Sequence, residues 1–147
     1  MRSRIGGYID RLDSKDGILR IVDYKTGGSA DTPPNVSSLF VPDKNRSNYV
    51  FQTFLYASIM CRKQSMKVAP SLLYIHRAAS ENYSPVVCLK EPRKAEEPVL
   101  DFSIYEEEFR KHLQQLLADI FNKELCFEQT SIEEKCAYCD FKEICKK

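Results

Sequence analysis

The sequence lacks three features that assign many proteins to a class at once: a long apolar run, a leader segment and an excess of charge of one sign. No segment approaches the apolar length that a transmembrane helix needs, so we expect no membrane insertion. No signal peptide precedes the first predicted strand, which favours a cytoplasmic protein. With 22 basic and 21 acidic residues, the net charge of +1 gives no overall signature of nucleic-acid binding.

The 147 residues are enough for one domain with a hydrophobic core and leave no room for a second. We therefore predict a single domain over residues 1–147, with a cysteine-containing tail over 126–147. Charge is unevenly distributed, since residues 43–67 are mostly basic and residues 91–108 mostly acidic. A basic surface beside a catalytic site would suit a phosphate backbone, and a solvated helix end explains the same residues equally well.

The most informative stretch is a predicted β-hairpin over residues 7–27. Its two arms are rich in β-branched and aromatic residues. Between them stands Asp16-Gly17, a dipeptide favoured in two-residue turns because both central positions need positive φ. In the register that this turn sets, residues whose numbers sum to 33 face each other, and Asp10 lies opposite Asp23.

This pairing needs an explanation, because like charges directly opposite each other on two strands are destabilising. At roughly 5 Å and an effective dielectric constant near 20, the repulsion between Asp10 and Asp23 is on the order of 3 kcal/mol. A bound cation, or protonation of one carboxylate, would relieve it. Lys25 projects on the same face as Asp23 because side chains alternate along a strand. Asp13 and Arg20 would form an ordinary ion pair on the other face.

Two carboxylates and an ammonium on one sheet face can support metal-assisted attack on a phosphodiester. The metal would neutralise phosphate charge and lower the pKa of a bound water, while the lysine would orient or deprotonate that water. A hairpin with scattered surface charges is the alternative interpretation of the same spacing.

Three motifs, in this order and spacing, resemble those of the PD-(D/E)XK nucleases and, more narrowly, of RecB/AddB-type exonuclease domains. The motifs are Gly7-x-Ile9-Asp10-Arg11-x-Asp13, Asp23-Tyr24-Lys25-Thr26-Gly27 and Gln52-x-x-x-Tyr56-Ala57. The resemblance extends from about residue 5 to the C-terminus.

The resemblance implies that Mg²⁺ or Mn²⁺ is bound by the carboxylates of Asp10 and Asp23 and by the backbone carbonyl of Tyr24. Lys25 would then be the catalytic lysine. The helical pair Gln52 and Tyr56 would contact the metal-site waters or the scissile phosphate. Without the resemblance, we would interpret these two side chains, four residues apart on one helix face, as hydrogen-bonding each other.

The predicted fold class is α/β, with a mixed central sheet of about four strands flanked by helices. Besides the hairpin, the sequence predicts strands over residues 69–77 and 84–90, and helices over 48–64 and 104–124. The second helix has an apolar stripe that we expect to lie in the core. The stripe consists of Phe109, Leu113, Leu116, Leu117, Ile120 and Phe121. Residues 29–45, with three prolines, are predicted to be a long flexible loop.

In the resembled family, a helix with an acidic or histidine motif precedes the hairpin. Here Met1-Arg2-Ser3-Arg4 leads directly into strand residues. We therefore expect a restriction-endonuclease-like core that lacks its first helix and is a fragment of a larger protein.

The tail contains the spacing Cys136-x-x-Cys139-x5-Cys145, one half of the six cysteines of the chain. In a cytosolic protein this number does not favour disulfides. Two thiolates in a tight turn and a third on a following short helix can bind a metal, but tetrahedral zinc and cubane iron–sulfur sites both need four ligands.

In AddB-like and CRISPR-associated relatives, a similar tail ends the domain, and a cysteine upstream of the hairpin completes a [4Fe–4S] cluster. That cysteine is absent here. Three interpretations remain open: a cluster in the full-length protein held by Cys136, Cys139 and Cys145, a zinc site that uses Cys126, or free thiols. We expect no intact cluster in this chain.

The predicted function is metal-dependent DNA cleavage, as an exonuclease domain in DNA repair or recombination. Its expected partners are DNA and a helicase subunit, or a helicase-like region of the same polypeptide. The alternative is a non-catalytic DNA-binding or scaffolding module of a helicase–nuclease complex.

Overall fold

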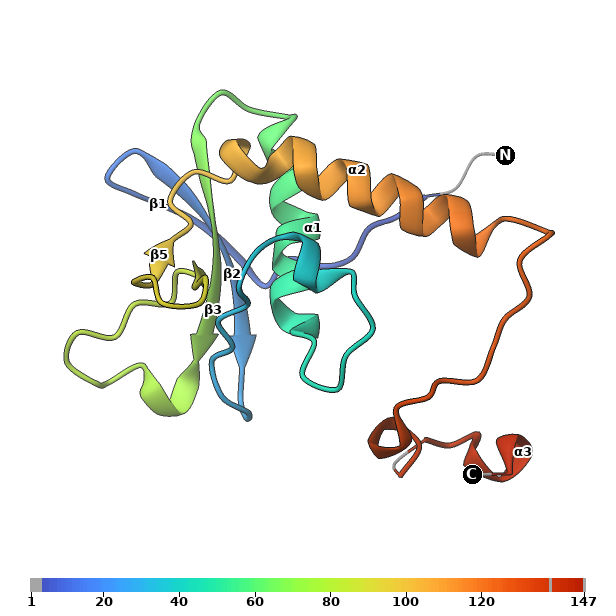
Figure 1. Ribbon diagram of the computed structural model, residues 1–147. Coiled ribbons are helices and arrows are strands. Elements are labelled where there is room, and N and C mark those ends of the chain that lie inside the picture. Colours follow the sequence, from blue (N-terminus) through green and yellow to red (C-terminus); the bar gives the residue numbers. More distant parts are fainter. Residues whose placement is uncertain (1–3, 138, 147) are drawn as a thin grey trace.

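The computed structural model describes residues 4–137 and 139–146 (Figure 1). Two parts of the sequence discussed above lie outside these ranges: residues 1–3, where we expect the truncation, and Tyr138 of the cysteine motif. Figure 1 shows a small sheet with α1 lying along it, α2 crossing α1, and the C-terminal tail extending away from the end of α2.

The turn and the register of the hairpin form as the sequence predicts, but the first strand begins at Arg11 and not at Gly7. Strands β1 (Arg11–Lys15) and β2 (Ile18–Lys25) are antiparallel, and every pair in their register sums to 33. Asp16 and Gly17 both have positive φ, 53° and 76°, as a primed two-residue turn requires. The ladder ends at the pair Arg11–Val22, one position short of Asp10 and Asp23.

Strand β3 (Lys67–Tyr74) pairs in parallel with β2, which gives a mixed sheet in the order β1-β2-β3. The parallel register places Leu72 beside Asp23 and Tyr74 beside Lys25. β3 is almost entirely buried, as the apolar run indicates. The strand predicted over residues 69–77 ends earlier, at Tyr74, and Ile75–Arg77 form a 3₁₀ turn.

The strand predicted over residues 84–90 does not extend the sheet as a continuous fourth strand. Val86 makes an isolated antiparallel bridge to Ser71 of β3. The chain then forms β4 (Cys88–Leu89), which pairs with β5 (Glu97–Pro98) in a separate two-stranded sheet. The fold is therefore mixed α/β with a three-stranded and a two-stranded sheet, instead of one sheet of about four strands. Pro85 and Pro98 lack N–H donors, which limits how far a ladder can run there.

The helices are α1 (Asn48–Cys61), α2 (Ser103–Ile120) and the short α3 (Lys142–Cys145). Ser47 caps α1, since its hydroxyl accepts a hydrogen bond from the backbone N–H of Val50 at 3.4 Å. A cluster of aromatic rings joins α1 and α2 to the loop that precedes α1. It consists of Phe40, Phe51, Phe54, Phe102 and Phe109.

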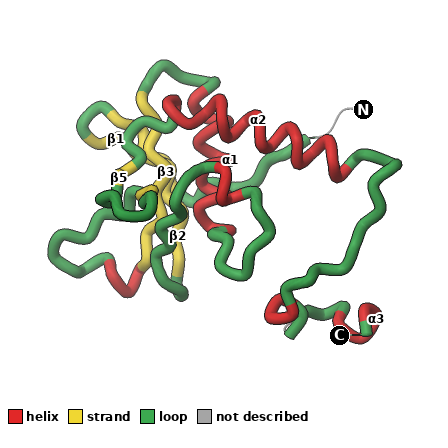
Figure 2. The backbone as a smooth tube through the Cα atoms, in the orientation of Figure 1, coloured by secondary structure: helices red, strands yellow, loops and turns green. Residues whose placement is uncertain are grey.

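The apolar stripe predicted for α2 is buried only at its N-terminal end. Phe109 is fully buried and Leu113 packs partly against the core, whereas Ile120 and Phe121 are 44% and 47% exposed. Figure 2 shows the reason, because the C-terminal half of α2 extends past α1 and the strands. Periodicity identifies the apolar face of a helix, but it does not say how much of that face meets a partner.

The segment before α1, predicted to be a long flexible loop over residues 29–45, is partly packed into the core. Val36 and Leu39, the latter in a 3₁₀ turn at Ser37–Leu39, are buried in the main core. This long connection is therefore anchored to the domain at its middle by apolar side chains.

The ion pair predicted on the outer face of the hairpin is present. Arg20 donates two hydrogen bonds to the Asp13 carboxylate, at 2.6 and 2.8 Å, and Arg11 lies 2.8 Å from it. These contacts, those of Arg20 first, hold the pKa of the Asp13 carboxyl below its ordinary value.

A lowered pKa in the folded state means that Asp13 stabilises the fold above its unfolded pKa of roughly 4, and that this contribution disappears as the pH falls through the folded pKa. We expect Asp13→Asn to lower the free energy of unfolding at pH 7, with the difference from wild type shrinking on acidification. Urea unfolding from pH 7 to pH 2 measures it. Glu81→Gln, at an exposed acid, is the control; a difference for Asp13→Asn that is independent of pH would contradict this assignment.

Candidate active site

The predicted pairing of Asp10 with Asp23 is not part of the observed ladder, and the two acids near the end of β2 are held differently. Asp10 is exposed and precedes β1, and its Oδ2 accepts a hydrogen bond from the backbone N–H of Tyr24 at 2.9 Å. The Asp10 carboxylate thus takes the place of a further ladder bond. It is fixed against the backbone between Asp23 and Lys25.

Asp23 is buried, with 5% of its surface exposed. Its Oδ2 lies 2.5 Å from Nζ of Lys25, two residues further along β2, and their side chains share one face of the sheet. The ammonium lies beside this oxygen without the alignment of a hydrogen bond, and Oδ2 has no other hydrogen-bond partner among residues 4–137 and 139–146. The charge of this buried carboxylate is therefore balanced by the Lys25 ammonium.

Lys25 has a second neighbour that the sequence analysis missed. Its Nζ lies 4.0 Å from the centroid of the Tyr49 ring in the first turn of α1, which is a cation–π distance. Tyr49 precedes Gln52 by three residues, so the spacing of a shared helix face was the one signal that could have indicated it. The ring and Asp23 together keep the ammonium in a mostly buried position.

Gln52 and Tyr56 face the same way on α1 and contact each other. Nε2 of Gln52 donates a hydrogen bond to the Tyr56 hydroxyl at 3.1 Å. In the part of the chain that the structure describes, no hydrogen bond joins this pair to Asp10, Asp23 or Lys25. The structure therefore shows the mutual hydrogen bond, while the predicted contact with phosphate or metal-bound water stays a prediction.

Gly7 is the second residue that the sequence analysis did not assign to the site. A Cβ at Gly7 would overlap the Tyr56 hydroxyl and approach two of its ring carbons to 3.1 Å. The absence of a side chain lets the phenol reach the segment that leads to Asp10, three residues further on. Gly7 thus connects the helical pair to the start of the hairpin.

The groups at the end of β2 suit a hard divalent cation. Carboxylate oxygens of Asp10 and Asp23 and the carbonyl of Tyr24 are the oxygen donors that Mg²⁺ and Mn²⁺ prefer. The buried Oδ2 of Asp23 already has the Lys25 ammonium beside it, so a bound metal ion would share this oxygen with Lys25. The residues present therefore offer the kind of oxygen donors that such an ion binds.

The cysteine tail has the predicted local shape. The backbone N–H of Cys139 donates to the carbonyl of Cys136 at 3.1 Å, which closes a tight turn, and Cys145 is the last residue of α3. All three thiols are free and half-buried, and Cys126 is free and exposed. Among the residues that the structure describes, no three His, Cys, Asp or Glu side chains form a metal-binding group. These thiols alone do not make up a four-ligand set.

The tail makes little contact with the rest of the domain. In Figure 1 it leaves the end of α2 and runs beside the loop before α1, where Lys44 Nζ lies 3.7 Å from Glu134. Its large apolar side chains Phe127, Phe141 and Ile144 are 65–88% exposed. No helix within the described ranges is long and apolar enough to cross a membrane.

Comparison with known proteins gives one match. A family model described as the PD-(D/E)XK nuclease superfamily matches residues 2–146, which is nearly the whole chain. Searches of curated proteins and of solved structures gave no significant match.

Proposed function

Since the chain belongs to the PD-(D/E)XK nuclease superfamily, we propose that it is a Mg²⁺- or Mn²⁺-dependent deoxyribonuclease. More narrowly, we propose the exonuclease domain of a RecB/AddB-like protein of DNA repair or recombination, to which a helicase subunit or helicase-like region delivers DNA. The narrower proposal rests on the sequence motifs.

The observation that carries the proposal is the arrangement at the end of β2. Asp10 is fixed on the Tyr24 amide, and Asp23 is buried beside the Lys25 ammonium. The tripeptide Asp23-Tyr24-Lys25 thus presents one carboxylate, a carbonyl and a positioned cationic side chain, and Asp10 brings a second carboxylate to it. Metal-assisted hydrolysis of a phosphodiester can use this set of groups.

In this proposal each group has a defined role. Asp10, Asp23 and the Tyr24 carbonyl bind the cation, which when present neutralises phosphate charge and lowers the pKa of water. Lys25, held by Asp23 and the Tyr49 ring, orients the attacking water in line with the phosphorus and assists its deprotonation. Gln52 and Tyr56 support the position of the phosphate.

The three clustered thiols suggest a further cofactor only in a longer protein. Cys136, Cys139 and Cys145 would supply three ligands to a [4Fe–4S] cluster whose fourth ligand is not among them. No step of the proposed reaction depends on this cluster.

The direct test is degradation of linear DNA by the purified protein in Mn²⁺, with EDTA as the metal-free reference. We expect cleavage that EDTA abolishes and that Lys25→Ala abolishes, because the attacking water is then no longer oriented. Lys15→Ala, which removes an exposed lysine from the same hairpin, should retain the wild-type rate. Salt-sensitive DNA binding without cleavage in any divalent cation would instead favour the non-catalytic DNA-binding module.

A further inference from the structure

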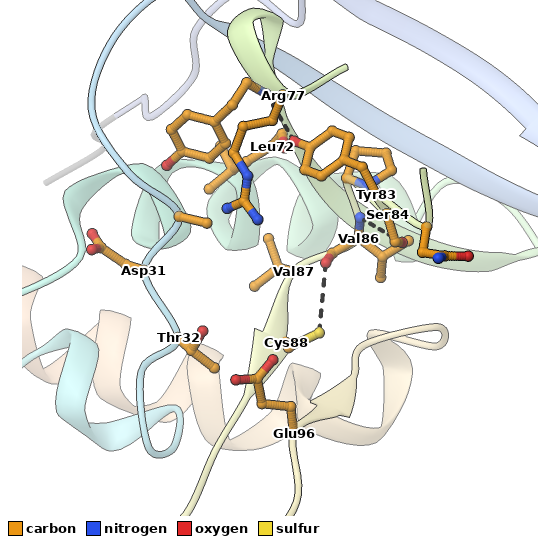
Figure 3. Close-up of a pocket in the computed structure, with 14 residues that line it drawn as sticks. Asp31, Thr32, Leu72, Arg77, Tyr83, Ser84, Val86, Val87, Cys88 and Glu96 are labelled. Carbon is orange, nitrogen blue, oxygen red and sulfur yellow. Dashed lines mark hydrogen bonds between the residues drawn. The ribbon is translucent and has the colours of Figure 1, made fainter. Parts of the chain in front are cut away.

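A cavity of about 270 Å³ lies beside the C-terminal end of β3 (Figure 3). One wall is the segment that follows β2, and the other is formed by residues 82–88. Its polar side chains include Asp31, Thr32, Tyr74, Arg77, Asn82, Tyr83, Ser84 and Glu96, and its apolar surface includes Leu72 and Val87. The cavity thus combines an apolar surface with hydrogen-bond donors and acceptors.

Tyr74 is a lining residue whose hydroxyl lacks a hydrogen-bond partner within the described part of the chain. The residue is 1% exposed, and its hydroxyl has no hydrogen-bond partner anywhere in residues 4–137 and 139–146. Burial, with the negative charge of Asp31 as a further cause, raises the pKa of the phenol. Buried polar groups in native proteins are nearly always paired, so this hydroxyl at a cavity wall marks a position that a water or a polar group of a ligand would occupy.

Arg77 supplies a cationic donor from the 3₁₀ turn that follows β3. Its guanidinium lies 5.4 Å from the centroid of the Tyr83 ring. The Tyr83 hydroxyl is fixed on the edge of β3, because it donates to the Leu72 carbonyl and accepts from the Tyr74 N–H, both at 2.9 Å. Figure 3 shows the guanidinium directed into the cavity, toward the space between Asp31 and Val87.

The cavity is one strand away from the proposed catalytic groups. Leu72 and Tyr74, which line it, are the register partners of Asp23 and Lys25 in the parallel β2–β3 pair. Directly paired residues project on the same face of a sheet, at the 4.7–4.9 Å spacing of neighbouring strands. A small molecule in the cavity can therefore extend across Tyr74 to the end of β2.

The charges of the lining restrict what the cavity can hold. The carboxylates of Asp31 and Glu96 disfavour a phosphate, and a wholly apolar ligand would leave Arg77 and the Tyr74 hydroxyl unpaired. A neutral group with an apolar face and a hydrogen-bonding edge satisfies both conditions. The volume is below the roughly 300–1,000 Å³ of sites for larger ligands, which suits a single residue of a polymer.

We propose that this cavity binds the nucleoside of the nucleotide whose phosphate lies at Asp10, Asp23 and Lys25. The proposal rests on the proposed nuclease function for the phosphate, and on the cavity alone for the nucleoside. Arg77 and the Tyr74 hydroxyl hydrogen-bond the base or sugar, and Leu72 and Val87 contact its apolar face.

Calorimetric titration with thymidine, thymidine 5′-monophosphate and inorganic phosphate, each in Mn²⁺, separates the two parts. We expect Arg77→Ala to weaken the binding of thymidine and thymidine 5′-monophosphate about 10-fold or more, because a charged hydrogen bond is lost. Tyr74→Phe should weaken the binding of both a few-fold, because a neutral hydrogen bond is lost. Neither change should affect phosphate. Lys25→Ala should weaken the binding of phosphate and of thymidine 5′-monophosphate and leave the affinity for thymidine unchanged.

Arg62→Ala, an arginine outside the cavity at the end of α1, is the matched control and should bind all three probes as wild type does. In DNA cleavage, Arg77→Ala should raise KM more than it lowers kcat. If thymidine binding depends on Arg77 but the protein cleaves no DNA, the nucleoside-binding proposal is supported and the nuclease proposal is overturned. The nucleoside-binding proposal is overturned, and the nuclease proposal stands, if the protein cleaves DNA but does not detectably bind thymidine. The same holds if Arg77→Ala and Tyr74→Phe leave the thymidine affinity unchanged.

Discussion

Asp23→Asn is expected to lower the rate of Mn²⁺-dependent DNA cleavage by on the order of 10³-fold, the scale of losing one preorganised electrostatic group. The amide keeps the shape of the side chain but removes the negative charge that would bind the cation. It also removes the anion beside the Lys25 ammonium, which would no longer be held at 2.5 Å. Single-turnover cleavage of an end-labelled DNA strand measures the effect.

The matched control for this change is Asp16→Asn in the turn of the same hairpin. Asp16 has a φ of 53°, which asparagine tolerates as well as aspartate does, so hairpin and activity should be retained. Circular dichroism of both variants guards against loss of the fold. Wild-type cleavage by a folded Asp23→Asn protein would remove Asp23 from the proposed metal site.

Phe109→Ala is expected to cost about 3–5 kcal/mol of the free energy of unfolding, as large-to-small changes at fully buried aromatic positions do. Phe109 is the buried anchor of α2, with 0% of its surface exposed. Its ring lies 5.2–6.0 Å from the rings of Phe40, Phe51, Phe54 and Phe102. Truncation would leave a cavity where α2 meets α1, and urea unfolding measures the loss.

Ile120→Ala on the same helix provides the comparison. Ile120 belongs to the same predicted apolar stripe but is 44% exposed, so its truncation should cost less than about 1 kcal/mol. Equal costs at the two positions would mean that the C-terminal half of α2 is buried in solution, for example against another molecule.

The arrangement of the proposed catalytic groups followed largely from local sequence. A two-residue turn at Asp16-Gly17 fixes which residues pair, so Asp13 was correctly placed against Arg20, and Lys25 on the face of Asp23. What the register did not predict is that the ladder would end before Asp10. Instead, the Asp10 carboxylate accepts the hydrogen bond of the Tyr24 N–H. A side chain that competes with the backbone for an N–H donor is not described by alternation along a strand.

The surroundings of these groups depended on contacts between distant segments. Tyr49 reaches Lys25 only because α1 lies on the sheet, and Gly7 approaches Tyr56 only because the chain enters the hairpin beside that helix. The cavity at Tyr74 needs the segment after β2, the end of β3 and residues 82–88 in one place. No spacing within a single motif encodes such an arrangement.

The sequence by itself determined the elements whose partners are near in the chain: the hairpin, its register, the order of the motifs and the helical segments. The tertiary structure alone decided how much of α2 is buried, that the segment after β3 only bridges the main sheet before it forms β4 and pairs with β5, and which side chains surround Lys25 and Tyr74. The physical reason is that turn geometry and side-chain alternation act over a few residues. Burial and pairing between distant segments are instead set by the packing of the whole chain.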